Sequence, residues 1–271
     1  MNHIKTFLLI TLLSLIVISC TEVVDIDLET AQERLVIEAS INWEKGTLGN
    51  EQVIKLTKTA SFYDNEVVYA TGASVSIVDA NNVTYTFDET SDGIYTTSLF
   101  NPEFALDYTL NITYNDEVFT ATEQLISTST IDLLAQSTEL GFSDDPEITM
   151  FFTDPEETDN YYKTLMIHKR TEDFEQFYFN DQYWEGNQAM FWFESEDLEV
   201  GDEIDCYVFG ISQRYQKYGE KVFTLAGNRG GPFTTPPINI KGNCVNSTKS
   251  ENYPYGYFTM SEFSKETYIF E

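Results

Sequence analysis

Cys20 is the residue whose type and position point most directly to a chemical reaction. Residues 7–18 form an almost unbroken apolar segment, Lys5 precedes it, and Ser19 stands directly before the cysteine. This arrangement is typical of a secretory signal peptide that ends in a lipobox, although an ordinary secreted protein cut nearby would share most of it. A membrane-spanning helix would need about 20 apolar residues. We therefore expect residues 1–19 to be removed and the Cys20 thiol to become a thioether to diacylglycerol, an anchor in the lipid bilayer.

Catalytic histidine chemistry has little support. His3 belongs to the expected signal peptide, so His168 is the one histidine left, and the sequence contains neither Gly-x-Ser-x-Gly, His-Glu-x-x-His nor Cys-x-x-Cys. These are the usual local signatures of serine hydrolases and zinc sites. We expect His168 to be a half-exposed strand residue. A hydrolase with two catalytic carboxylates stays open, because sequence spacing in a β-fold does not report how far apart two acids lie. We expect no enzyme.

Three acidic segments offer the hard oxygen ligands that Ca²⁺ prefers. They lie at residues 25–29, 143–147 and 154–159, and none has the spacing of an EF-hand loop. Alternating acids on a strand usually form its solvated face, and acids around proline usually form a turn. Calcium is thus the cation that the sequence favours, while the leading expectation is a chain with no metal site and no cofactor.

The net charge of −30 limits the classes of partner. Phosphate backbones are bound by Lys and Arg, so we expect no nucleic acid partner. Once Cys20 is acylated, Cys206 and Cys244 remain. An even pair of thiols in an exported chain is compatible with a disulfide, and Cys206 reads equally well as a small residue of a strand. The sequence leaves both interpretations open.

Aromatic residues are dense between residues 174 and 193. Neighbours in a strand point to opposite faces, so we expect part of this set to fill a core and part to be exposed. Aromatic side chains are enriched in interface cores. The residues that we take as a candidate ligand or partner surface are Tyr178, Tyr183, Trp184 and Trp192.

These side chains must be positioned by β-strands. From residue 34 the polarity alternates with the period of two that is typical of a half-buried strand. Further alternating segments lie at 52–59, 74–79, 83–87, 94–98, 108–114 and 118–125, with turn residues such as Asn81-Asn82 and Asn115-Asp116 between them. Seven short strands without a helix predict an immunoglobulin-like β-sandwich over residues 34–127. The segment around Tyr108 also resembles a tyrosine corner.

The remaining chain predicts a second β-rich, sandwich-like domain over residues 128–271. Strands are expected at 148–152, 161–169 and 202–214, and residues 131–140 form a strand or a linking piece. Residues 174–184 and 189–193 are the aromatic-dense segments. Glycine and proline punctuate the part that follows. The fold class is therefore all-β, with residues 20–33 as the lipidated N-terminus and tether.

Several short motifs occur in a particular order along the chain. They are Cys20, Leu35-Val36-Ile37-Glu38-Ala39, Gly72 to Ile77, Gly93-Ile94-Tyr95, Asp154-Pro155, Asn160-Tyr161-Tyr162, Pro232-Phe233, Asn239-Ile240-Lys241-Gly242 and Gly256-Tyr257-Phe258. With this order the chain resembles the Bacteroidetes lipoprotein family called domain of unknown function 4249. The resemblance implies a lipoprotein of the kind commonly encoded beside a TonB-dependent outer-membrane transporter, with no established catalytic residues. Cys206 and Cys244 depart from that pattern.

The functional expectation follows from the lipobox, the β-rich chain and the resemblance. We expect a lipid-anchored outer-membrane protein, with exposure at the cell surface left open. It would act as a non-enzymatic accessory or ligand-capturing partner of a β-barrel TonB-dependent transporter. A stand-alone surface adhesin that binds glycans or proteins through its exposed aromatic residues is the alternative, and an extracytoplasmic hydrolase comes third.

Overall fold

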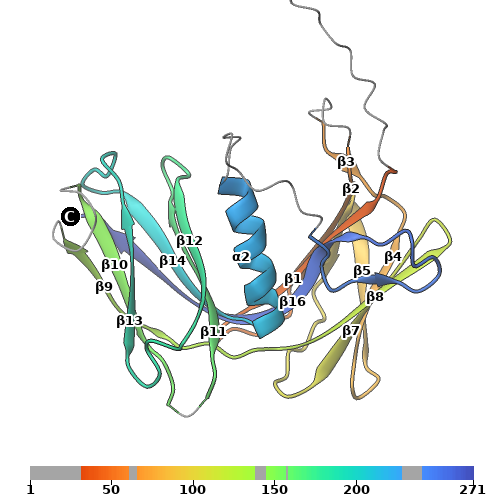
Figure 1. The fold of residues 1–271 in the computed structure, drawn as a ribbon, viewed down its shortest axis with the longest axis horizontal. Coiled ribbons are helices and arrows are strands. Elements are labelled where there is room, and N and C mark those ends of the chain that lie inside the picture. The colour runs from red at the N-terminus through yellow and green to blue at the C-terminus, as the bar shows by residue number, and fades with distance from the viewer. Residues whose placement is uncertain (1–31, 61–65, 138–144, 157, 228–239) are drawn as a thin grey trace, which may run out of the picture. The chain divides into compact units, whose positions relative to one another are not determined.

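The computed structural model describes residues 32–60, 66–137, 145–156, 158–227 and 240–271. Within it, Glu33–Glu271 form one compact unit (Figure 1). The expected signal peptide, Cys20 and most of the tether lie outside the described residues. None of the described helices combines the length and the apolar character that a membrane span requires. The all-β prediction is confirmed, since strands make up nearly all of the regular structure.

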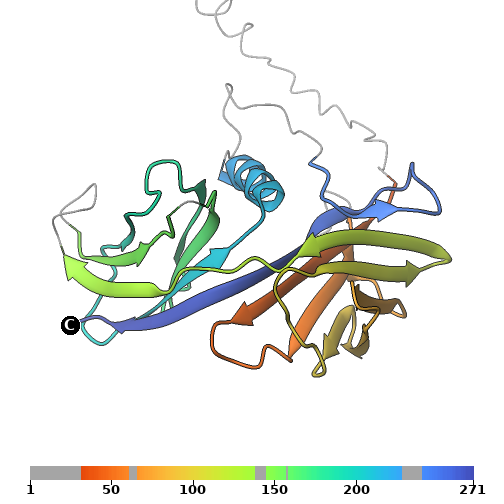
Figure 2. The ribbon, with the colours of Figure 1, turned by 90° about the horizontal axis from the view of Figure 1, so that it is seen from below.

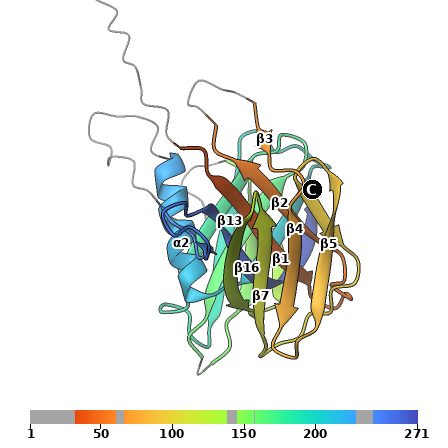
Figure 3. The same cartoon turned by 90° about the vertical axis from the view of Figure 1, so that its right-hand side faces the viewer.

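The first core lies between two layers of strands (Figures 1 and 3). One layer contains β1 (Leu35–Glu44), β2 (Gln52–Lys58), the short β3 (Val68–Tyr69) and β6 (Ile94–Thr97). The other contains β4 (Ser74–Asp79), β7 (Asp107–Tyr114), β8 (Glu117–Gln124) and β15 (Val245–Asn246). Strand β5 (Thr84–Ser91) belongs to both, because its first half pairs with β4 and its second half with β6.

Hairpins in this region follow the turn residues that the sequence predicts. Asn82, Asn115 and Asp116 adopt positive φ values of 64°, 49° and 61°, a region that asparagine and aspartate tolerate better than most residues. They connect β4 to β5 and β7 to β8. The alternation of β1 is also confirmed, with Leu35 to Ile41 burying every second residue.

Tyr108 makes the contact expected of a tyrosine corner. Its side chain is fully buried. Its hydroxyl accepts a hydrogen bond from the Glu103 backbone N–H (2.8 Å) and donates one to the Glu103 carbonyl (3.1 Å). The connection that precedes β7 is therefore fixed to the strand by a side chain in the core.

A second core lies between four strands of the large sheet and a separate sheet of three strands. The four strands are β11 (Tyr161–His168), β12 (Phe174–Asn180), β14 (Glu203–Gly210) and the second half of β16 (Tyr255–Ile269). The small sheet contains β9 (Ile131–Ser137), β10 (Glu147–Thr153) and β13 (Gln188–Glu194). Phe152, Met166 and Phe193 are among the residues that fill this core.

Strand β16 serves both cores, as Figure 2 shows. Its first half pairs in parallel with β1, where Ile37 lies opposite Gly256, and places Phe258 in the first core. Its second half pairs antiparallel with β14. The sequence did not predict this strand.

Helix α2 (Gln213–Gly227) is the element that the sequence analysis assigned wrongly, because a strand was predicted to continue to Arg214. Strand β14 ends at Gly210, and Ser212 then caps the helix by accepting a hydrogen bond from the Tyr215 N–H (3.2 Å). Such a serine satisfies one of the N–H groups that a helix start leaves without a partner. The helix packs on β12, and a Cβ at Gly219 would lie 2.2 Å from the Tyr178 ring.

Candidate functional site

The four aromatic residues taken as a candidate surface do not form one surface. Tyr178 lies beneath α2, where its ring meets that of Tyr215 edge to face at 6.0 Å. Trp184 packs on the second core against Phe179 and Phe191. The main role of both side chains is therefore packing inside the protein.

Tyr183 is the most accessible member of the set, with 79% of its surface exposed. Trp192 is half-buried on the side of β13 opposite the buried Phe191 and Phe193. The mixed prediction of core and surface positions for the aromatic run is thus confirmed, and Phe174 and Phe177 are further exposed members of it.

His168 is not half-exposed, as the sequence predicted, but completely buried. Its Nε2 lies 2.9 Å from the Asp202 carboxylate, and its Nδ1 lies 2.9 Å from the Thr171 hydroxyl. Arg170 holds the same carboxylate through two contacts of 2.8 Å and keeps the pKa of Asp202 well below its usual range. The imidazole is thus enclosed in a structural network without access to a ligand.

The acidic segments proposed for calcium are only partly described. Residues 25–29, 143, 144 and 157 lie outside the described residues. Asp154 is buried, and the Tyr162 hydroxyl donates a hydrogen bond to it at 2.6 Å. Burial raises the pKa of the Asp154 carboxyl above its ordinary value. Within the described ranges, no three His, Cys, Asp or Glu side chains come together as a metal site would require.

Cys206 and Cys244 are not joined by a disulfide. Both thiols are free and buried, and they belong to different cores, Cys206 to the second and Cys244 to the first. Burial raises the pKa of each thiol to about 12. The pairing interpretation of the two cysteines is therefore wrong for this structure.

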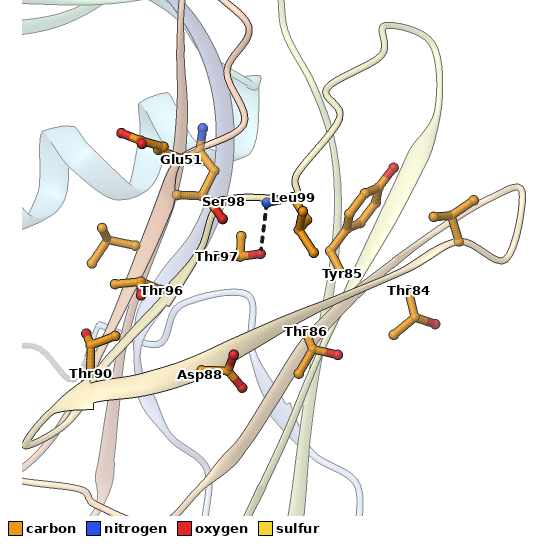
Figure 4. A pocket seen from close by; sticks show the side chains of 13 residues that line it. Glu51, Thr84, Tyr85, Thr86, Asp88, Thr90, Thr96, Thr97, Ser98 and Leu99 are labelled. Atoms are coloured by element: carbon orange, nitrogen blue, oxygen red, sulfur yellow. Dashed lines mark hydrogen bonds between the residues drawn. The ribbon is translucent and has the colours of Figure 1, made fainter.

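A depression with a volume of about 820 Å³ lies where β5 crosses between the layers (Figure 4). Figure 4 shows a row of short polar side chains along it, including Thr84, Thr86 and Asp88 of β5. Thr97 of β6 faces them and accepts a hydrogen bond from the Leu99 N–H (3.3 Å). The lining contains two carboxylates and no cation, so it offers no charge complementary to an anion.

A more specific arrangement lies at the start of α2, around the buried carboxylate of Glu123 on β8. Arg214 and Asn243 each donate a hydrogen bond to Glu123 Oε1 at 2.9 Å, and the Tyr257 hydroxyl donates one at 3.3 Å. Burial raises the pKa of Glu123, and the neighbouring Arg214 guanidinium acts in the opposite direction. These contacts join β8, α2, the segment before β15 and β16.

Close backbone contact holds this arrangement together. A Cβ on Gly242 would lie 1.6 Å from the Gly256 carbonyl oxygen, so only glycine fits there. The side-chain amide of Asn243 pairs with the backbone of Phe258 in the way that a neighbouring strand would. It donates a hydrogen bond to the Phe258 carbonyl (2.8 Å) and accepts one from the Phe258 N–H (2.9 Å). The motifs around Gly242 and Gly256, which lie apart in the sequence, therefore meet in space.

Beside this contact lies a depression of about 360 Å³, which we call the lysine pocket. Its lining residues are Arg214, Lys217, Tyr218, Lys221, Ile240, Lys241, Gly242, Asn243 and Tyr257. The rings of Tyr218 and Tyr257 lie 4.7 Å apart and form an aromatic wall. None of the described residues that line the pocket is a carboxylate.

The sequence analysis did not find this pocket. Lys217, Tyr218 and Lys221 follow Arg214 by three, four and seven positions, which is the spacing of one helix face. The strand prediction for residues 202–214 hid that spacing. Lys241 and Tyr257 come from distant segments, so local periodicity could not add them.

Comparison with known proteins gives one family match. The family model described as "Domain of unknown function (DUF4249)" matches residues 21–267. No curated protein matches the chain.

Similarity to solved structures is weak. A DUF4785 family protein of Legionella pneumophila has a TM-score of 0.23 and 9% identity, covering 67% of this chain and 53% of that one. The chicken interferon gamma receptor alpha chain has a TM-score of 0.21 and 10% identity, covering 65% and 86%. A bacterial ice-binding adhesin has a TM-score of 0.21 and 11% identity, covering 88% and 63%. The chain spans about half the length of the Legionella protein.

Proposed function

The chain belongs to the DUF4249 family, and from this premise we propose that it is an outer-membrane lipoprotein, a non-enzymatic accessory or ligand-capturing partner of a TonB-dependent transporter. One observation carries the proposal. The family match begins at residue 21, one residue after Cys20, so it leaves out the expected signal peptide and covers the chain that would follow the anchor. The transporter is what the family resemblance implies.

The anchor also supports a partner in the same membrane. The compact unit begins at Glu33. An extended chain covers at most about 3.6 Å per residue, so the segment from Cys20 to Glu33 spans no more than roughly 45 Å. A lipid on Cys20 therefore keeps the folded unit close to the bilayer, within reach of the extramembrane loops of a transporter.

Affinity purification tests the proposal. The tagged lipoprotein is purified from gently solubilised native outer membrane, and co-purifying proteins are identified by mass spectrometry. We expect a β-barrel transporter in stoichiometric amount, and its loss from a Cys20→Ala variant that cannot be acylated. A lipoprotein that emerges alone at several detergent strengths would rule the accessory role out.

We also propose that β1 to β8 adopt an immunoglobulin-like arrangement. The Tyr108 hydroxyl bonded to the Glu103 backbone supports it, since this contact is typical of the tyrosine corner in such sandwiches. The crossing of β5 from one layer to the other also supports this arrangement. An experimental structure of the mature protein, compared strand by strand with immunoglobulin domains, tests this assignment.

A surface adhesin is the second candidate function. Its support is the exposure of Tyr183 and Phe174, which are 79% and 56% exposed. Aromatic side chains with an exposed ring are suited to stacking on sugars and to protein contacts. Retention on insoluble glycans in the absence of any transporter, lost in a Tyr183→Ala variant, would favour this function over the first.

A further inference from the structure

The distribution of positive charge is uneven in this acidic chain. It contains 45 Asp and Glu residues against 15 Lys and Arg residues, of which Lys5 and Arg229 lie outside the described residues. Among the described cations, eight form an ion pair with a carboxylate. They are Lys45, Lys55, Lys58, Lys169, Arg170, Arg214, Lys249 and Lys265.

Five described cations have no carboxylate partner among the residues that the structure describes. Arg34 donates to the backbone carbonyl of Tyr253 and lies over its ring, and Lys163 lies over the ring of Phe209. The other three, Lys217, Lys221 and Lys241, all line the lysine pocket, and the Nζ of Lys241 also lies 3.7 Å from the centroid of the Tyr253 ring. In a chain with three acids for every base, three lysines without a carboxylate partner have gathered at one depression.

We propose that the lysine pocket binds a small ligand with at least two negative charges, and that a phosphorylated sugar is the class that fits it. Lysine ammonium groups bind phosphate as point charges. Tyr218, which is partly exposed, offers aromatic surface to a ring, whereas Tyr257 is buried and packs against it. Glu123 neutralises Arg214 and leaves Lys217 and Lys221 to the ligand, while Lys241 is shared with the ring of Tyr253.

The surrounding charge limits the size of the ligand. Electrostatic interactions between exposed groups fade beyond about 8 Å at physiological ionic strength. A compact anion inside the pocket therefore experiences mainly the lysines. A long anionic polymer would extend over the acidic surface and be repelled. This site requires neither the transporter nor the membrane anchor, so it goes beyond the proposed function.

Isothermal titration of the mature lipoprotein in a non-ionic detergent tests the site with three probes. Pyrophosphate carries charge without a ring, glucose carries a ring without charge, and glucose 6-phosphate carries both. We expect glucose 6-phosphate to bind most tightly, pyrophosphate more weakly and glucose not at all, with affinity falling as salt is raised. Equal binding of glucose and glucose 6-phosphate, or no saturable binding of either phosphate at low salt, would overturn the proposal.

Matched variants assign the binding to the pocket. A Lys217→Gln/Lys221→Gln double variant removes two exposed lysines of α2, and we expect it to weaken binding of glucose 6-phosphate by about tenfold. The control variant Lys55→Gln/Lys169→Gln removes the same charge from two exposed lysines that pair with Glu38 and Glu203. Equal weakening in both variants would attribute binding to net charge and refute the site.

Discussion

The guanidinium of Arg214 lies 2.9 Å from the carboxylate of Glu123, although the two residues are 91 positions apart in the sequence. Arg214 is on α2 and is largely exposed, whereas Glu123 is on β8 and is buried. This ion pair fixes the start of the helix to the first core. The position of Tyr218 in the lysine pocket depends on this pair, because Arg214 and Tyr218 belong to the same helix.

Replacing Arg214 should therefore destabilise the protein. An Arg214→Gln variant leaves a buried carboxylate without its cation, and we expect a loss of about 1–2 kcal/mol, below the value for fully buried pairs because Arg214 is exposed. Urea unfolding measures the change. The double variant Arg214→Gln/Glu123→Gln should recover part of the loss, because it removes the unpaired charge. If the loss in the double variant equals the sum of the losses in the single variants Arg214→Gln and Glu123→Gln, the two residues do not interact.

A Tyr108→Phe variant tests the tyrosine corner in the connection that precedes β7. The variant keeps the buried ring but leaves the Glu103 N–H without its partner, so we expect a loss of about 1–2 kcal/mol in urea unfolding. Tyr183→Phe is the control, since Tyr183 is exposed, and it should leave the unfolding free energy unchanged. Equal effects of the two changes would contradict a structural role for the Tyr108 hydroxyl.

Lys163 should make stability depend on alkaline pH. Burial lowers the pKa of this lysine from 10.5 to about 8. Between these values the unfolded chain binds more protons on Lys163 than the folded chain does, so folding stability rises with pH. A Lys163→Met variant should be more stable near neutral pH, by at most about 3 kcal/mol, and should lose this rise. Urea unfolding of both proteins between about pH 7 and pH 9.5 checks the prediction, and a parallel rise in both would refute it.

The cysteines should be inert in the folded protein. Because burial raises the pKa of the Cys206 and Cys244 thiols to about 12, almost no thiolate is present near neutral pH. We expect no reaction with a thiol reagent in native buffer and two reactive thiols per acylated chain in denaturant. A Cys206→Ser variant should show one. Absence of thiols in denaturant without reductant would indicate a disulfide.

The strands of the first core could be predicted because each has one face toward the core. Period-two burial in β1 and the turn at Asn115-Asp116 are visible in the sequence. Strand β16 lacks that signal. Residues from Tyr257 to Glu262 are all buried, because both faces of the strand are covered, and continuous burial gives no alternation to recognise.

The errors at the candidate site have related causes. His168 lies on the same buried face of β11 as Tyr162 and Met166. Its polarity suggested exposure, because its partners Asp202 and Thr171 are not evident from the local sequence. Similarly, the contacts of Glu123 come from four separate segments. Alternation in a strand reports which face a residue is on, and it does not report what other segment covers that face.

Sharing one strand between two cores determines the order in which this chain can fold. Strand β16 follows every other described strand in the sequence, yet β1 requires it as a neighbour. Pairing of such distant segments is slow, because a long loop must close first. Until then β1 and β14 each present an open edge, a surface on which chains aggregate. Neither core therefore has all of its strand pairs until β16, the last strand of the chain, is in place.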